Sequence, residues 1–514
     1  MTHTYDYIIV GAGSAGCVLA NRLTENPQTR VLLLEAGPRD RRLEIHIPAA
    51  FSQLFRTECD WAYQTEPQRQ LGDRSVYWPR GKVLGGSSSL NASIYIRGHR
   101  WDYDFWQESG NSGWGFDDLL PYFKKADGLL NPTHRPYTNP LSDRLIAAAR
   151  STGLSYLDDL NTPEPEGVGY YQVTQKRGRR NSTAAAYLVP CRHRNNLAIL
   201  TGARVTRLLW EGRRAVGVEF QHDSGSIENA KTRREVILCG GTVNSPQLLM
   251  LSGVGAGDRL QALGIPVVVD LPGVGRNLQD HLVAGVLSEC TQRISLDRAN
   301  TPLNLLKYFL FGRGPLTSNV AEAGGFIKTR PDLPRPDLQL HFAPAYFLNH
   351  GFTKPDGYGF TLGATPLRPQ SRGYIDLHSP NPMDAPIIQP NYLSTEADWQ
   401  VLRSGILRCR QILQAAAFDD ARGAEFLPGI NAKSDREIDE YIRDRTETLY
   451  HPVGTCKMGN DRAAVVNDRL QVLGTEGLRV VDASIMPTIA SGNTNAPTIA
   501  IAEKAADTIV GDRK

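Results

Sequence analysis

The chain has 514 residues and a formal net charge of +3, with 48 glycines and 32 prolines. A single core stops growing at about 250–300 residues, so this length predicts two domains. The small charge argues against nucleic acid as a partner. No apolar run reaches the roughly 18 residues that span a membrane, and the N-terminus lacks the regions of a signal peptide. Seven scattered cysteines without a C-x-x-C pair predict reduced thiols in a cytosolic protein.

A glycine-rich turn stands near the start of the chain. An apolar run over residues 5–10 meets the sequence GAGSAG at 11–16, and a helical pattern then leads to a second apolar run that ends at Glu35. The first glycine permits a tight turn, the second lets the backbone approach a pyrophosphate, and the third lets helix and strand pack closely. The helix start offers N–H groups to phosphate, and Glu35 can accept from ribose hydroxyls. This pattern predicts a dinucleotide site without separating FAD from NAD.

Two further glycine pairs follow apolar segments. Residues 85–89 read GGSSS between Val-Leu and Ile-Tyr-Ile runs, which favours a surface for a flat polar group over a flexible linker. Residues 234–239 read as a strand that ends at Gly240, and a helix is expected from Ser245, with Ser245 as N-cap and Pro246 in the first turn. This second strand–glycine–helix unit predicts another backbone approach to the same cofactor.

The remaining elements are predicted from periodicity and turn signals. Helices are expected over residues 117–126, 143–151, 395–417 and 435–446, and strands over 197–210, 214–220 and 478–483. From about residue 288 to 393 the composition shifts toward proline, aromatics and alternating runs such as 338–342 and 373–378. This shift predicts a second, largely antiparallel domain. The apolar helix candidate over 303–311 is interpreted as a core helix, with a lid over the site and a membrane-touching patch as alternatives.

Two polar segments near the C-terminus carry the candidate chemistry. His451 stands between Tyr450 and a Pro-Val-Gly run, on a bent backbone that can aim one imidazole. Residues 493–495 read Asn-Thr-Asn and run into a helical stretch with Pro497 in its first turn. An imidazole suits general-base chemistry, and a helix start stabilises a ring that gains negative charge. We therefore expect His451 to be a catalytic base that faces an electron-accepting ring.

Three ordered motifs resemble those of the glucose-methanol-choline (GMC) family of FAD-dependent oxidoreductases. Residues 81–104 resemble the first family signature, and residues 241–255 resemble the second. His451-Pro452 with the Asn-Thr-Asn segment at 493–495 resembles the active-site pair of the choline dehydrogenase-like branch. The resemblance runs from about residue 6 to residue 509. It implies an α/β (α+β overall) architecture in which a Rossmann-like FAD-binding domain carries a second, largely antiparallel-sheet substrate domain.

The resemblance also implies a discontinuous division of the chain. The FAD-binding domain is expected to take residues 1–155, 195–287 and 446–514, and the substrate domain residues 156–194 and 288–445. We expect a monomer or homodimer in the cytoplasm, with peripheral membrane association as the alternative location. No nucleic acid, transmembrane segment or metal is expected.

Individual roles follow from the resemblance. His451 would remove the hydroxyl proton, and Asn493 would hydrogen-bond the substrate oxygen so that its carbon faces flavin N5. Asp280-His281 lies in a family hinge loop and is interpreted as structural. Covalent members carry histidine where this chain has Leu90, so non-covalent FAD is expected. The implied cofactor-binding residues are Gly11, Gly13, Ser14, Ala15, Gly16, Glu35, Ala36, Trp61, Arg80, Val83, Gly86, Ser87, Asn91, Ala92, Ile94, Val205, Gly240, Ser245, Tyr450, Asp482, Ala483, Asn495, Pro497 and Thr498.

The implied reaction is oxidation of a primary alcohol (aryl, furanic, aliphatic or choline-like) to the aldehyde by base-assisted hydride transfer. A dehydrogenase that uses a quinone or an artificial dye is preferred, and an oxidase that makes hydrogen peroxide from O₂ is the alternative. Choline would need aromatics and an acid, which the sequence does not place. A lyase or photodecarboxylase on the same fold, or a flavin-binding protein without catalysis, is a further hypothesis that His451 and Asn493 argue against.

Overall fold

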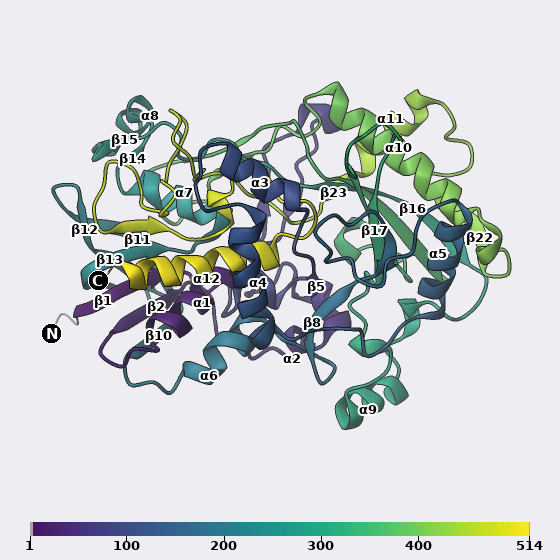
Figure 1. The fold of residues 1–514 in the computed structure, drawn as a ribbon, viewed down its shortest axis with the longest axis horizontal. Helices are drawn as coiled ribbons and strands as arrows, with labels where there is room; N and C mark the ends of the chain where they lie inside the picture. Colours follow the sequence, from purple (N-terminus) through teal and green to yellow (C-terminus); the bar gives the residue numbers. More distant parts are fainter. Residues whose placement is uncertain (1–3, 513–514) are drawn as a thin grey trace.

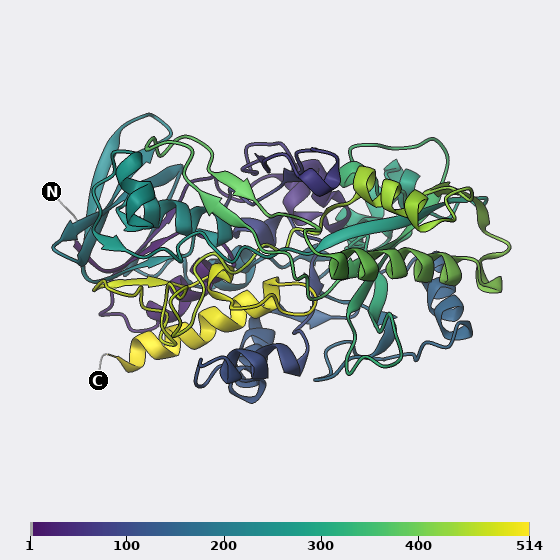
Figure 2. The same cartoon turned by 90° about the horizontal axis from the view of Figure 1, so that it is seen from above.

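The computed structural model describes residues 4–512. The molecule is elongated, and its two large sheets lie toward its two ends (Figure 1, Figure 2). The first sheet contains β1 (Thr4–Val10), β2 (Val31–Glu35), β10 (Leu197–Thr201), β11 (Ala203–Glu211), β12 (Arg214–His222), β13 (Ile227–Leu238) and β24 (Leu478–Val480). The strand order is β10-β2-β1-β13-β12-β11, with β24 also paired to β13. Strands β10, β2, β1, β13 and β24 pair with one another in parallel. Strand β12 pairs antiparallel with both β13 and β11.

The helices beside this sheet are α1 (Ser14–Leu23), α7 (Gly241–Leu251) and α12 (Asn495–Gly511). Helix α1 packs against α12, and α4 (Phe116–Leu130) packs on the outside of α12. Strand β2 reads VLLLE and is buried at every position, as expected for a strand covered on both faces. Helix α7 is buried at nearly every position because it is apolar around most of its surface.

The second sheet is antiparallel throughout. It contains β7 (Gly167–Tyr170), β16 (Leu282–Cys290), β17 (Ala323–Ile327), β18 (Leu338–Ala343), β19 (Gly359–Pro366), β22 (Arg422–Leu427) and β23 (Glu447–Thr448). The strand order is β22-β16-β19-β18-β17-β7, with β23 also paired to β16. Helix α10 (Glu396–Leu413) packs on this sheet and contacts α5 (Pro140–Ser151) and α11 (Asp435–Arg445). The predicted fold class is confirmed. The predicted boundary at residue 287 falls inside β16, and the domain division itself stays a prediction.

The remaining helices and strands have the following bounds. They are α2 (Leu43–His46), α3 (Arg100–Glu108), α6 (Val189–Cys191), α8 (Gly257–Ala262), α9 (Pro302–Phe311), β3 (Tyr63–Gln64), β4 (Tyr77–Trp78), β5 (Ile94–Tyr95), β6 (Pro132–Thr133), β8 (Gln172–Lys176), β9 (Arg179–Arg180), β14 (Val254–Gly255), β15 (Val269–Asp270), β20 (Tyr374–Asp376) and β21 (Ile387–Gln389). All seven cysteines are free and buried. Among the helices within residues 4–512, none combines the length and apolarity needed to cross a bilayer.

Three local predictions are wrong. The strand expected over 197–210 is two strands, β10 and β11, because the chain turns at Gly202 with φ +64°. Helix α7 starts at Gly241 rather than at Ser245, since Gly241 has φ +80° and lets the chain enter the helix directly after the strand. Ser245 is therefore not an N-cap. The candidate core helix over 303–311 forms as α9 but carries most of its apolar side chains in solvent.

Candidate active site

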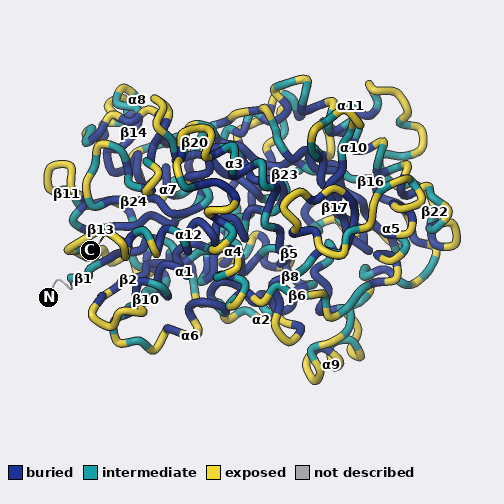
Figure 3. The backbone as a smooth tube through the Cα atoms, viewed as in Figure 1, coloured by how far each residue is buried: buried dark blue, intermediate teal, exposed yellow. Residues whose placement is uncertain are grey.

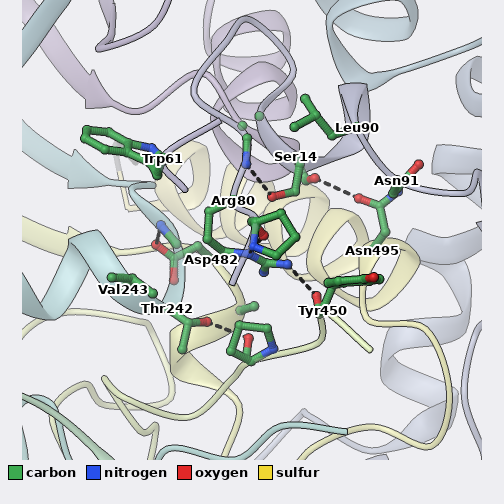
Figure 4. A pocket seen from close by; sticks show the side chains of 18 of the residues that line it. Ser14, Trp61, Arg80, Leu90, Asn91, Thr242, Val243, Tyr450, Asp482 and Asn495 are labelled. Atoms are coloured by element: carbon green, nitrogen blue, oxygen red, sulfur yellow. Dashed lines mark hydrogen bonds between the residues drawn. The ribbon is translucent and has the colours of Figure 1, made fainter. Parts of the chain in front are cut away.

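A cavity of about 340 Å³ is lined by residues from both sheets and from the loops between them. Its lining includes the glycine turn after β1, the end of β2, the start of α7 and the start of α12. Residues of β18 and β19 also reach it, as does the 3-10 helix η1 (Pro48–Leu54). Figure 4 shows part of the cavity, with Ser14, Trp61, Asp482 and Asn495 among its side chains.

The glycine turns approach one another so closely that a side chain would not fit between them. A Cβ on Gly11, where φ is +98°, would lie 2.5 Å from the carbonyl oxygen of Cys239. A Cβ on Gly16 would lie 1.9 Å from the Gly11 carbonyl oxygen, and one on Gly86 would lie 2.6 Å from the Cα of Gly13. These contacts bring bare backbone to the cavity wall, which is the arrangement that lets a pyrophosphate approach a helix start.

Two buried carboxylates hold the loops around the cavity. Glu35 accepts from the backbone N–H of Ala12 at 2.8 Å and of Gly37 at 2.9 Å, and burial raises its pKa to about 7. Asp482 accepts from the Gly241 N–H at 2.9 Å and from the Ser245 hydroxyl at 2.6 Å. Both carboxylates therefore brace the turns that form the cavity wall.

A contact between two helix starts completes this part of the wall. The Ser14 hydroxyl at the start of α1 donates to Oδ1 of Asn495 at the start of α12, at 2.7 Å (Figure 4). The first N–H groups of an α-helix lack partners inside the helix, and its N-terminus carries partial positive charge. Bare glycine backbone and two helix starts on one elongated wall fit the phosphates and the anionic reduced ring of an FAD molecule.

The loop that carries His451 is held from both sides. Tyr450 adopts φ +71°, a backbone conformation that is rare for a bulky residue and turns the chain sharply before His451. Arg80 donates through Nη2 to the Tyr450 carbonyl oxygen at 2.7 Å (Figure 4). Oδ1 of Asp280 accepts from the His451 backbone N–H at 2.9 Å. These contacts direct the imidazole of His451 to the cavity, which it lines.

A hydrogen-bonded chain sets the tautomer of His451. Nε2 of His281 lies 2.9 Å from the Leu367 carbonyl oxygen, which can only accept, so this nitrogen carries hydrogen. Nδ1 of His281 then has the lone pair, and it lies 3.0 Å from Nδ1 of His451, which must donate. Nε2 of His451 is therefore the basic nitrogen. It accepts from Nδ2 of Asn493 at 3.1 Å.

Burial keeps this imidazole neutral. Burial lowers the pKa of His451 well below its usual value of 6.5, and the neighbouring His281, His341 and Arg80 lower it further. Burial likewise lowers the pKa of His281 to about 4. Both rings are therefore uncharged near neutral pH, and the lone pair on Nε2 of His451 can take a proton.

Apolar side chains also line the cavity, and apart from Leu90 none of them was predicted from the sequence. They are Phe51, Phe55, Leu90, Val283, Val320, Ala321, Ala343 and Phe347. His341 lies among them, and within the described residues neither of its ring nitrogens has a hydrogen-bond partner. The sequence holds one signal for this residue. In β18, Leu338, Leu340 and Phe342 alternate with Gln339 and His341, which indicates a strand with one polar face.

The cavity brings together the predicted site residues with three exceptions. Gly16 packs against Gly11, Val83 is buried in a separate apolar cluster, and Pro497 is buried in the first turn of α12. The other predicted residues line the cavity. Their roles in binding or catalysis stay predictions. His281, interpreted from sequence as structural, touches the ring of His451.

Comparison with known proteins agrees with this geometry. Two family models described as GMC oxidoreductase match residues 5–283 and 369–502. Mouse mitochondrial choline dehydrogenase is 48% identical over 99% of this chain and 89% of its own length. The alcohol dehydrogenase [acceptor] of Pseudomonas putida is 48% identical over 98% and 96%. The crystal structure of pyridoxine 4-oxidase from Mesorbium loti superposes with a TM-score of 0.90 at 35% identity, covering 99% of both chains. The chain therefore belongs to the GMC oxidoreductase family and is an FAD-dependent oxidoreductase.

Proposed function

We propose that this enzyme oxidises an uncharged primary alcohol to the aldehyde, with His451 as the base that accepts the hydroxyl proton. The observation that carries the proposal is the basic Nε2 of His451, which faces the cavity and is paired with the amide of Asn493. Bound FAD would supply the acceptor for the two electrons that alcohol oxidation releases. A neutral imidazole next to an amide donor is suited to deprotonating a hydroxyl group.

Each of the two side chains has a defined task. The substrate hydroxyl would replace the direct contact between Asn493 and His451, donating its hydrogen to Nε2 while its oxygen accepts from the Asn493 amide. As the proton moves to Nε2, the amide stabilises the negative charge that develops on the oxygen. Nδ1 of His451 keeps its hydrogen bond to His281 throughout, so the ring does not rotate while it takes the proton.

The lining favours an aryl or aliphatic substituent over choline. Glu35 and Asp482 are the carboxylates that line the cavity within the described residues, and both are occupied by backbone and side-chain donors. Aromatic rings such as Phe51 and Phe347 can attract a cation, but a buried quaternary ammonium would still lack a counter-charge. The equal identity to a choline dehydrogenase and to an alcohol dehydrogenase does not separate the two substrates.

The proposed electron acceptor is a quinone or an artificial dye rather than O₂, in a cytoplasmic monomer or homodimer. The similar Pseudomonas putida enzyme supports this assignment, because it is named an alcohol dehydrogenase [acceptor]. The oxidase alternative has its own support, since the structurally similar pyridoxine enzyme is named an oxidase. Hydrogen peroxide formation under air, compared with dye reduction without oxygen, distinguishes the two.

The test is anaerobic mixing of the holoenzyme with benzyl alcohol, 1-octanol or choline, followed by the visible absorbance of FAD. The two apolar alcohols should bleach the flavin faster than choline does. His451→Ala should slow bleaching by about 10²–10⁴, whereas His378→Ala, at an exposed position, should not. Bleaching within a few-fold of the parent in His451→Ala would refute the proposed mechanism. No bleaching by any alcohol would favour a lyase or photodecarboxylase.

A further inference from the structure

Helix α9 projects from the body of the molecule (Figure 1), and much of its backbone trace carries the colour of exposed residues (Figure 3). Its large apolar side chains lie in solvent. The exposed fractions are 60% for Leu303, 55% for Leu306, 55% for Phe309, 64% for Leu310 and 69% for Phe311. Scattered apolar residues on a surface need no explanation, but a contiguous cluster of this kind marks an interaction site. The cluster is called the α9 apolar face below.

The opposite side of α9 packs on the wall of the active-site cavity. Tyr308 is buried against Ile47 and Ala50, and its hydroxyl donates to the His46 carbonyl oxygen at 2.8 Å. Ala50 belongs to the 3-10 helix η1, and the next residue of this helix, Phe51, lines the cavity. Beyond the C-terminal end of α9, Val320 also lines the cavity. Whatever binds the α9 apolar face therefore lies one layer away from the cavity wall.

Five exposed cations lie on α9 or on segments next to it. Lys307 lies on α9 and Arg313 follows it. The β8–β9 hairpin supplies Lys176, Arg177 and Arg179. Its turn touches the end of the helix, because a Cβ on Gly178 would lie 2.2 Å from the Gly312 carbonyl oxygen. Within residues 4–512 none of these five cations forms an ion pair.

No acidic residue lies nearby in sequence to offset this charge. Residues 167–193 and 298–321 contain no Asp or Glu. A short helix that presents Leu and Phe to solvent, next to Lys and Arg, has the character of an interfacial helix. Anionic lipid headgroups attract clustered cations of this kind near a membrane surface.

We propose that α9 docks this enzyme on an anionic phospholipid surface. The α9 apolar face enters the boundary between headgroups and acyl chains, and the five cations meet the lipid phosphates. A second copy of the chain is a poorer occupant, because a two-fold interface places each patch against itself and would bring like charges together. The bilayer then lies next to the part of the cavity wall formed by Phe51 and Val320.

Vesicle sedimentation of the holoenzyme tests the proposal. The enzyme should sediment with vesicles of phosphatidylcholine and phosphatidylglycerol, less so at high salt, and more weakly with phosphatidylcholine alone. The triple variant Leu306→Ser, Leu310→Ser, Phe311→Ser should lower the bound fraction by at least about tenfold. Lys307→Gln with Arg313→Gln should lower it by at least about fivefold.

Controls separate docking from folding and from catalysis. The double variant Ile227→Ser, Ile430→Ser removes side chains that are 62% and 59% exposed elsewhere, and it should bind vesicles like the parent. All variants should retain FAD and be reduced by benzyl alcohol at the parent rate. The proposal is overturned if the parent does not bind phosphatidylglycerol vesicles, or if the triple and charge variants bind like the parent. A dimer that the triple variant converts to a monomer, without vesicle binding, would assign the face to a second copy.

Discussion

The imidazole rings of His281 and His451 meet edge to face, at 82° and with their Nδ1 atoms 3.0 Å apart, although the residues are 170 positions apart in sequence. The Leu367 carbonyl oxygen orients the first ring, and the first ring determines which nitrogen of the second is basic. His281 is fully buried, so water cannot take its place. We expect His281 to be a positioning residue for the proposed base.

Replacing His281 should slow turnover without preventing substrate binding. His281→Leu removes the acceptor and leaves the Nδ1 hydrogen of His451 buried without a partner, so kcat should fall by about tenfold or more. His281→Asn can present Oδ1 near the position of Nδ1, so it should restore most of the rate. Stopped-flow reduction with benzyl alcohol measures both effects. A matching loss in the two variants, or a change confined to KM, would contradict the positioning role.

The pH dependence of kcat/KM should show no acid limb near the ordinary pKa of histidine. Burial lowers the pKa of His451 below 6.5, so the base stays neutral as the pH falls through that value. Protonation inactivates a base, and activity should therefore decline only at clearly lower pH. Because kcat/KM reports groups of the free enzyme, anaerobic reduction at limiting alcohol across this range is the measurement. An acid limb centred at or above 6.5 would count against the prediction.

His341 should make folding sensitive to acid. Burial lowers its pKa from 6.5 to about 3, so below pH 6.5 the unfolded chain binds a proton that the folded chain does not. The free energy of unfolding should then fall by about 1.4 kcal/mol per pH unit for this group, down to the folded pKa. His341→Gln removes the group, and the difference in stability between variant and parent should show this slope. A difference that is independent of pH would exclude the linkage.

Substitutions at Gly11 and Gly13 should distinguish a role in folding from a role in binding FAD. A Cβ on Gly11 would meet the Cys239 carbonyl oxygen at 2.5 Å with φ at +98°, so Gly11→Ala should cost about 1–3 kcal/mol of stability without FAD. A Cβ on Gly13 would find its nearest atom at 3.9 Å, so Gly13→Ala should leave the apoprotein within about 0.5 kcal/mol of the parent. Because Gly13 lines the cavity, the same change should weaken FAD retention on gel filtration. Unchanged FAD retention in Gly13→Ala would contradict the assignment of Gly13 to the FAD site.

FAD should leave the protein when the fold is lost. Leu90 lines the cavity and cannot form the covalent bond that a histidine makes at the corresponding family position. Acid or heat precipitation should therefore release the yellow colour into the supernatant. Colour that stays with the precipitate would show a covalent link elsewhere in the chain.

Much of the cofactor site is predictable because local spacing determines it. A strand, a GAGSAG turn and a helix place bare backbone at a helix start wherever they occur, and Glu35 follows at the end of the next strand. His451 and Asn493 could be predicted for a different reason, because the segments that carry them resemble the active-site pair of the GMC family. The cavity lining includes both.

Only the tertiary structure brings His281 and His341 beside His451. His281 directly precedes β16, His341 lies in β18, and His451 follows β23. No local pattern states which of these distant segments will meet. Helix α9 shows the same limit, because its apolar residues predict a helix but periodicity cannot state whether that face meets a core or solvent. The sequence by itself determined a flavin oxidoreductase and led us to expect His451 as its base. Long-range packing decided which nitrogen of His451 carries the lone pair, which side chains line the cavity, and that α9 lies outside the core.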